Sequence, residues 1–319
     1  MHIECDANKL EPVKRESTML KRIIILAALL AFAGPAWAGG GQQKPLEGTY
    51  PIVLAHGLLG WGEESTGLTS IINYWGGMDD YLRSEGVDVY APAQPPGSSN
   101  AHRGEVLNEK IRYWMAANGY DKVHTLGHSQ GPLGLRYAVS NLGLSSKVVS
   151  VTSLNGVNRG TGLADGLAPL IANGTVSGII ETFVNLIYAV NDGDAQAVID
   201  SLSTDGMAVF NTYTPNVSGV RYYSYGSVIN GVNLIQHPVG SLLYHFTGKE
   251  SRDVHGYAND GFVPLSSMKW GEWKGGPDTP WYSTGVDHLQ CANTLYLGEA
   301  WFDVEGYFLK MAKNMKAGQ

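Results

Sequence analysis

The sequence has few charged residues and no long block of either sign. Of its 319 residues, 16% are charged and 44% are hydrophobic, which is typical of a compact globular protein rather than a disordered one. The formal net charge of −7 is spread along the chain, so we expect no nucleic acid among its main partners. We find no internal repeat and, beyond a Gly/Gln/Pro-rich stretch at 39–48, no low-complexity segment.

The chain also lacks, near its start, an apolar run long enough to cross a bilayer. Residues 23–33 are apolar, 11 in all, whereas a membrane-spanning helix needs about 20. Basic residues precede this run and small residues follow it, which is the layout of a secretory signal peptide over 19–38. The alternative is a retained membrane anchor. We expect a secreted protein without a stable anchor, with Met19 as the true start, residues 1–18 as an upstream extension, and a mature chain that begins near Gly39.

Cysteine is scarce. Of the two present, Cys5 lies upstream of the expected cleavage site, so the mature chain keeps only Cys291 and cannot form an internal disulfide. Stability must therefore come from a hydrophobic core. The remaining chain is long enough to form one.

Short apolar runs alternate with helical patterns in the first half of the chain. This alternation predicts a mostly parallel sheet with helices on both faces, within a single domain over 39–319. The expected strands are 50–57, 87–90, 122–127 and 147–156, and the expected helices are 78–85, 104–118 and 132–142.

The segment 161–190 departs from this rhythm. It is apolar and punctuated by glycine. Two interpretations fit the pattern: an ordinary helix of the core, or a mobile helical cap over a lipid-binding cleft.

A G-x-S-x-G motif, GHSQG at 127–131, lies between an expected strand and an expected helix. In this context the motif is a nucleophile elbow, a tight turn that lifts the serine hydroxyl above the sheet. The glycines at both ends of the motif avoid side-chain collisions in so tight a turn. We predict Ser129 as a nucleophile.

The acid and the base should follow the serine along the chain, in that order. Asp260 in NDGFVP and His288 in DHLQ satisfy this order, on loops that we expect at the carboxyl edge of late strands. Two rivals are weaker. His255 precedes Asp260, and Asp287 is the direct neighbour of His288, whose ring it cannot easily orient.

The oxyanion hole is expected from backbone N–H groups. One is that of Gln130, directly after the nucleophile and at the start of a helix. The second is that of Leu58, in the loop that follows the strand ending in His56-Gly57.

These motifs together resemble the bacterial triacylglycerol lipases of the Pseudomonas/Burkholderia type, an α/β-hydrolase family. The resemblance implies an α/β-hydrolase fold with Ser129 as nucleophile, Asp260 as acid, His288 as base, and Leu58 and Gln130 as oxyanion donors. It is carried by YPIVLAHGLLGW, GHSQG with its following RY, SLSTDGMAVFN, RYYSYG, NDGFVP and DHLQ.

Three features depart from the family pattern. Family members carry a calcium site with an aspartate two residues after the catalytic histidine, where this chain has Gln290. No clear second aspartate precedes GKESRD, and calcium requires several oxygens including carboxylates. We therefore expect no metal and no other cofactor. Many relatives also have a disulfide, which this chain cannot make, and Pro132 replaces a usual small residue after the motif.

The expected activity is secreted carboxylic ester hydrolysis through an acyl-enzyme, foremost of triacylglycerols at an oil–water interface. A short-chain carboxylesterase or an aliphatic polyester depolymerase would use the same triad, because fold and triad do not set the substrate. A more remote alternative is a non-catalytic domain that binds lipid or a partner protein, against which the complete Ser-Asp-His order argues. A dedicated folding chaperone is a further partner to test.

Overall fold

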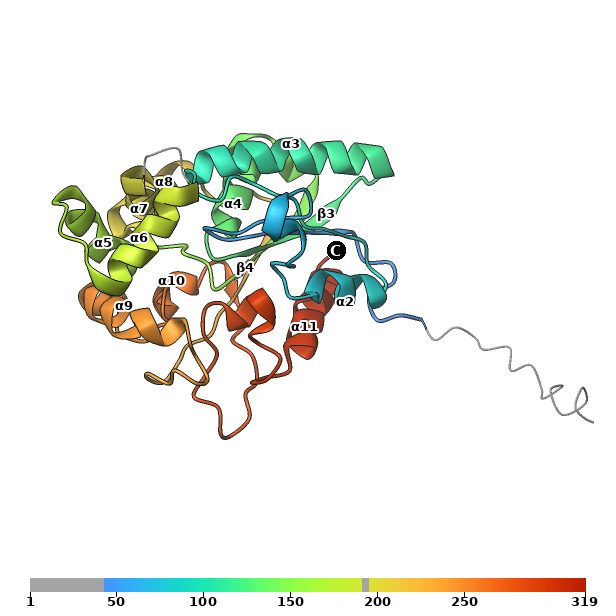
Figure 1. Cartoon of the computed structure of the whole chain (residues 1–319). Coiled ribbons are helices and arrows are strands. Elements are labelled where there is room, and N and C mark those ends of the chain that lie inside the picture. Colours follow the sequence, from blue (N-terminus) through green and yellow to red (C-terminus); the bar gives the residue numbers. More distant parts are fainter. Residues whose placement is uncertain (1–42, 191–194) are drawn as a thin grey trace, which may run out of the picture. The chain divides into compact units, whose positions relative to one another are not determined.

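The computed structural model describes residues 43–190 and 195–319 (Figure 1). The expected signal peptide and Cys5 lie outside these residues. The strands are β1 (Ile52–Ala55), β2 (Val89–Tyr90), β3 (Val123–His128), β4 (Val148–Leu154), β5 (Arg221–Tyr225) and β6 (Glu272–Trp273). The helices are α2 (Met78–Ser84), α3 (Asn100–Asn118), α4 (Gly131–Asn141), α5 (Gly162–Ala172), α6 (Gly178–Val190), α7 (Ala195–Leu202), α8 (Thr204–Tyr213), α9 (Gly240–His255), α10 (Leu265–Met268) and α11 (Val304–Ala317).

Within the described residues, six strands form one parallel sheet in the order β2-β1-β3-β4-β5-β6. Leu54 of β1 pairs with Leu126 of β3, which pairs with Thr152 of β4. Every strand in the sheet therefore points the same way, and the loops after the strands gather at one edge. The predicted parallel sheet is confirmed.

Helices cover both faces of the sheet, as the alternation of strands and helices predicts. Ile52 and Leu54 pack into a core with α2 and α11, while Val53 and Ala55 pack into a second core with α3 and α4. Successive residues of a strand point to opposite faces, which explains this division. Figure 1 shows α3 and α4 on one side of the sheet and α2 and α11 on the other.

The helix α3 begins four residues earlier than the expected 104–118. Ser99 caps it, because its hydroxyl accepts a hydrogen bond from the N–H of His102. The preceding Pro/Gly/Ser run is typical of a loop, but its final serine is also a preferred N-cap residue, and this ends the loop at position 99.

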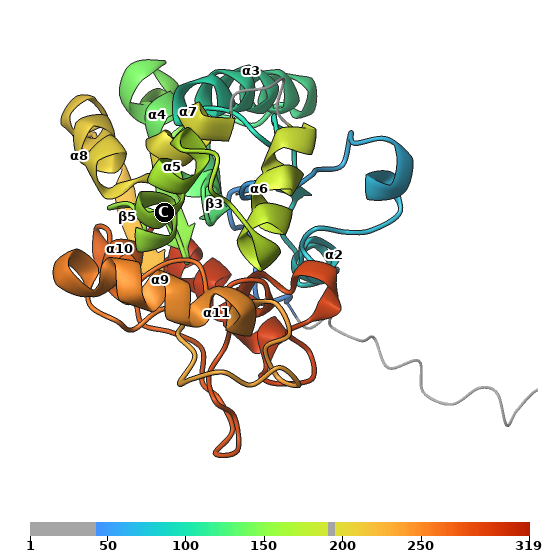
Figure 2. The ribbon, with the colours of Figure 1, turned by 60° about the vertical axis from the view of Figure 1, so that its left-hand side comes forward.

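A third core is formed by α5 to α10 around Leu133 and Val157. The segment 161–190 forms two of these helices, which differ in burial. Leu163 and Leu167 of α5 are buried, and this helix packs along α9 and α7. Among the residues of α6 whose burial is described, only Val184 and Ile187 are buried. Figure 2 shows α5 and α6 between α3 at the top of the view and α9 toward the bottom. No helix in the described part of the chain is long and apolar enough to span a membrane.

Candidate active site

Ser129 lies in the sharp turn between β3 and α4. Its φ is 59°, in the left-handed region that residues other than glycine rarely adopt. The flanking glycines are required by close approaches: a Cβ on Gly127 would lie 2.2 Å from the nitrogen of Pro132, and one on Gly131 would lie 2.1 Å from the carbonyl oxygen of Ala55. The expected collision across the turn therefore exists for Gly127, whereas Gly131 is constrained by the neighbouring strand. Pro132 is accommodated in the first turn of α4.

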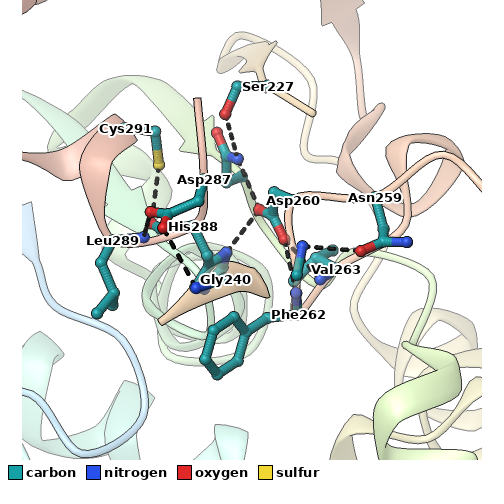
Figure 3. A network of polar contacts seen from close by, with 12 residues as sticks. Ser227, Gly240, Asn259, Asp260, Phe262, Val263, Asp287, His288, Leu289 and Cys291 are labelled. Atoms are coloured by element: carbon teal, nitrogen blue, oxygen red, sulfur yellow. Dashed lines mark hydrogen bonds and ion pairs between the residues drawn. The ribbon is translucent and has the colours of Figure 1, made fainter. Parts of the chain in front are cut away.

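His288 and Asp260 are paired. The Nδ1 atom of His288 is 2.6 Å from Oδ2 of Asp260. The backbone N–H of His288 also donates to the backbone carbonyl of Asp260, at 3.0 Å. Figure 3 shows the two side chains facing each other. Neither residue directly follows a strand: Asp260 comes after α9, and His288 lies well beyond β6. Long connections bring both loops to the same edge.

The carboxylate of Asp260 is fully buried and held on both oxygens. Oδ1 accepts the N–H groups of Phe262 at 2.9 Å and Val263 at 2.7 Å, while Oδ2 accepts from Nδ2 of Asn155 at 2.7 Å as well as from His288. A buried carboxylate needs such donors to remain charged. With Nδ1 of His288 donating to it, the opposite ring nitrogen is left as an acceptor.

The two rival residues lie elsewhere. The carboxylate of Asp287 accepts the N–H groups of Gly240, Leu289 and Gln290 and does not contact the His288 ring. Burial raises the pKa of Asp287. The Nε2 atom of His255 lies 2.9 Å from the hydroxyl oxygen of Thr204.

Ser129 and His288 line one cavity of about 460 Å³. In the described part of the chain no hydrogen bond joins the Ser129 hydroxyl to the His288 imidazole. The walls are mostly apolar and come from the loop after β1, from the third core and from α6; they include Leu58, Val157, Leu163, Phe183, Leu186 and Phe262. The Phe262 ring stacks on His288 at 5.1 Å between centroids and meets the Phe183 ring of α6 at 5.8 Å.

The two expected oxyanion donors are available. Among the described residues, neither the N–H of Leu58 nor that of Gln130 has a hydrogen-bond acceptor. Arg103 sets the direction of the first: its guanidinium donates to the carbonyls of His56 at 2.6 Å and Gly57 at 3.1 Å. A trans peptide points its C=O and the next N–H in opposite directions, so fixing the Gly57 carbonyl fixes the Leu58 N–H.

His128, inside the motif, links the two sides of the site. Its Nε2 donates to the carbonyl of His288 at 2.9 Å, which leaves Nδ1 to accept from the Tyr74 hydroxyl at 2.7 Å. The Tyr74 oxygen in turn accepts the Gly57 N–H at 3.0 Å. Burial, and then the neighbouring His288 ring, hold the pKa of His128 well below 6.5, so the ring is neutral and can play both roles.

The comparisons with known proteins agree with this architecture. A family model described as the alpha/beta hydrolase fold matches residues 50–219. The chain belongs to the α/β-hydrolase family.

The hydrolase is similar to curated bacterial lipases. It is 33% identical over 244 residues to a triacylglycerol lipase from Vibrio cholerae, covering 68% of this chain and 76% of that protein. It is 29% identical over 251 residues to a triacylglycerol lipase from Pseudomonas fragi, covering 70% and 83%. The resemblance drawn from the motifs is confirmed, and so is the expected class of serine ester hydrolases.

Solved structures share the fold of the hydrolase. Lipase 1 from Pelosinus fermentans matches with a TM-score of 0.60 at 21% identity, over 84% of this chain and 98% of that one. A metagenomic carboxyl esterase matches with a TM-score of 0.60 at 17% identity, over 85% and 76%. The fold is common to lipases and esterases and does not separate them.

Three residues of the site have no motif of their own. Arg103, Tyr74 and Asn155 act on partners 46, 54 and 105 positions away in the hydrolase. Arg103 precedes the expected start of its helix at 104, and a buried arginine at a helix N-terminus has no distinctive sequence pattern. Only Asn155 carries a signal, since it ends the expected strand 147–156 beside a glycine.

Proposed function

We propose that this hydrolase is a triacylglycerol lipase that uses Ser129, Asp260 and His288 as a catalytic triad. The observation that carries the proposal is the convergence on one apolar cavity of the serine at the elbow and the histidine paired with a buried carboxylate. Two relatives of known name, from Vibrio cholerae and Pseudomonas fragi, are triacylglycerol lipases, which supports the substrate class.

The reaction would proceed in two acyl-transfer steps. Nε2 of His288 takes the Ser129 hydroxyl proton while Oγ attacks the ester carbonyl carbon, and the carbonyl π electrons move to its oxygen. The tetrahedral intermediate collapses, the ester C–O bond breaks, and His288 returns the proton to the leaving alcohol. Water then attacks the acyl-enzyme with His288 as base, and the fatty acid leaves as Ser129 regains its proton.

Asp260 and the backbone amides would stabilise the charges that form. Asp260 keeps the proton on Nδ1 of His288 and faces the imidazolium that appears in both steps. The N–H groups of Leu58 and Gln130 would receive the oxyanion, helped by the positive end of α4. Because Arg103 already fixes the Leu58 peptide, little reorganisation is needed when the charge develops.

A long acyl chain suits the cavity better than a short one. Its walls are mostly aliphatic and aromatic, and α6 contributes Phe183 and Leu186 to them. We propose that α5 and α6 form the cap of the site and that the exposed apolar side chains of α6 meet an oil–water interface. A soluble short-chain esterase, or a depolymerase of aliphatic polyesters, is the alternative that the same triad would serve.

We propose that the hydrolase works without calcium. Gln290, at the position of the family's calcium-binding aspartate, uses its side chain within the protein: Oε1 accepts from the Asp287 N–H and from Nδ1 of His237, both at 3.0 Å, and Nε2 donates to the Gln236 carbonyl. The Asp287 carboxylate is likewise occupied by three backbone N–H groups. These donors hold the histidine loop where a cation would otherwise collect oxygens.

Export is also part of the proposal. Residues 19–38 have the layout of a signal peptide and lie outside the described residues. The proposal of a dedicated folding chaperone rests on the resemblance to the family alone.

The first experiment is tributyrin hydrolysis by the mature protein and by Ser129→Ala, below and above the solubility limit of the substrate. We expect a rise in rate above the limit for the wild type, and a loss on the order of a millionfold in turnover for the variant. EDTA in the assay is expected to make no difference. Saturation below the limit with no further rise would favour the esterase.

Covalent labelling by a fluorophosphonate separates catalysis from binding. We expect one label per chain, on Ser129. If the wild type is neither labelled nor active on several esters, the non-catalytic binding domain replaces the lipase.

A further inference from the structure

Asn155 occupies a turn directly after β4. Its φ is 47°, in the left-handed region, and its side chain is fully buried. Glycine adopts this conformation at no cost, and asparagine is one of the few other residues that tolerate it. Because glycine would satisfy the backbone, the amide side chain is what asparagine adds at this position.

The amide nitrogen of Asn155 joins two segments that follow later in the chain. Nδ2 donates to Oγ of Ser227 at 2.9 Å and to Oδ2 of Asp260 at 2.7 Å. The same Oδ2 accepts from Nδ1 of His288 at 2.6 Å. Figure 3 shows Asp260 with Ser227 on one side and Phe262 and Val263 on the other.

These donors fix the rotation of the carboxylate. The backbone N–H groups of Phe262 and Val263 hold Oδ1, but they would allow the other oxygen to swing. Asn155 and His288 both donate to that second oxygen. Without the amide, His288 would be the only donor to Oδ2 among the described residues.

The amide oxygen of Asn155 adds to the cost of this residue at the position. It is buried and has no hydrogen-bond partner in the described part of the chain. A left-handed backbone and an unpaired buried oxygen are both unfavourable, and such features concentrate at functional sites. The position therefore retains asparagine at a cost that glycine would avoid.

We propose that Asn155 is a positioning residue that orients the Asp260 carboxylate toward His288. The proposal rests on the proposed function, since the orientation matters only if His288 acts as the base. Asn155 does not line the cavity. It should therefore affect turnover through Asp260 and leave substrate binding alone.

The test compares Asn155→Gly and Asn155→Asp in the mature protein, with a soluble ester as substrate. Glycine keeps the backbone conformation and removes the amide, so we expect kcat to fall about 10- to 100-fold with KM within about twofold. Aspartate keeps the size, but once ionised it cannot donate and it repels Asp260, so its kcat should fall further at a pH above the pKa of the new carboxyl group. The low-field proton NMR signal of the His288–Asp260 hydrogen bond should shift or broaden in both variants.

Asn158→Ala is the matched control. Asn158 is also fully buried, and its amide donates to Oγ of Ser153 and to the Met268 carbonyl without reaching Asp260. We expect a lower Tm with kcat within about threefold of the wild type and an unchanged low-field signal.

Three outcomes separate this inference from the proposed function. If Asn155→Gly or Asn155→Asp retains wild-type kcat while Ser129→Ala is inactive, the positioning role is overturned and the lipase stands. If Asn158→Ala loses as much kcat as Asn155→Gly, the loss is structural and the positioning role is again overturned. If Ser129→Ala keeps wild-type activity, the proposed function itself fails.

Discussion

At the scale of single residues, Arg103 is a buried cation with no acidic partner among the described residues. Its guanidinium donates to the carbonyls of Pro95, His56 and Gly57, and burial lowers its pKa to about 9. Burying a charge without a counter-ion is costly. The arrangement is explained by its effect on the Leu58 N–H, whose direction it fixes.

Replacing Arg103 by methionine is therefore expected to lower kcat/KM about 100-fold, the effect of losing one oxyanion donor. Lysine should not rescue the activity, because a single ammonium group cannot reproduce a planar fork that holds three carbonyls. The measurement is kcat/KM on a soluble ester beside Tm for both variants. Wild-type kcat/KM in the methionine variant would mean that the loop keeps its shape without the arginine.

Some site residues can be predicted from the sequence and others cannot. The two groups differ in how far along the chain their signal or their partners lie. Ser129, Asp260 and His288 each lie in a short run with turn-forming glycine, proline or a paired acid, so local patterns single them out. Arg103 has no distinctive local pattern, and Asn155 is marked only by its place beside a glycine at the end of an expected strand, because both residues act on partners far along the chain. Only the folded backbone brings those partners together.

At the scale of elements, α6 is the helix whose burial does not match its composition. Ile179, Leu186 and Tyr188 are 46%, 51% and 42% exposed, although Leu186 also lines the cavity. An apolar helix that is half exposed beside a cavity needs an apolar surface to cover it. The proposed oil–water interface would supply one.

We therefore expect Ile179→Asp to reduce hydrolysis of emulsified tributyrin at least about tenfold, because a charge would enter the apolar surface. Hydrolysis of a small soluble ester should change by less than about twofold, since Ile179 does not line the cavity and the triad is untouched. Val209→Asp on α8 is the matched control: Val209 is 62% exposed and does not line the cavity, and both rates should be retained. Equal losses on both substrates in Ile179→Asp would contradict an interfacial role for α6.

The sequence could predict the strands and helices up to β4. It could not predict that 161–190 forms two helices, one buried and one largely exposed. Periodicity identifies an amphipathic or apolar helix, and it does not say whether the apolar face meets protein or an outside surface. In α5 the face meets α9 and α7, whereas α6 leaves much of its face open. No helix is predicted beyond residue 190, although α7 to α11 lie there.

At the scale of the whole molecule, three hydrophobic cores hold the described chain together without a disulfide. Two lie on opposite faces of the sheet, and the third is formed by α5 to α10. Cys291 is a free, buried thiol whose Sγ lies 3.1 Å from the His288 carbonyl. The expectation that stability comes from core packing agrees with this organisation.

Several histidines lie inside these cores, and this makes stability depend on pH. Burial, together with the nearby charge of Arg103, lowers the pKa of His56 to about 3, and burial lowers the pKa of His124 to about 4. In the unfolded chain a histidine titrates near 6.5. Between these values the unfolded state binds more protons than the folded state. The contribution of these histidines to the free energy of unfolding is therefore fully present above about pH 6.5 and is lost as the pH falls toward 4.

His124 allows this dependence to be tested away from the site. It lies on β3, with Nδ1 2.8 Å from Oγ of Ser150. One such histidine contributes about 1.4 kcal/mol per pH unit to the slope of the unfolding free energy. We expect His124→Gln to reduce that slope by about this amount between about pH 6 and about pH 4.5, measured by urea unfolding at a series of pH values. An unchanged slope in His124→Gln would mean that its ring takes up a proton in the folded protein as readily as in the unfolded chain.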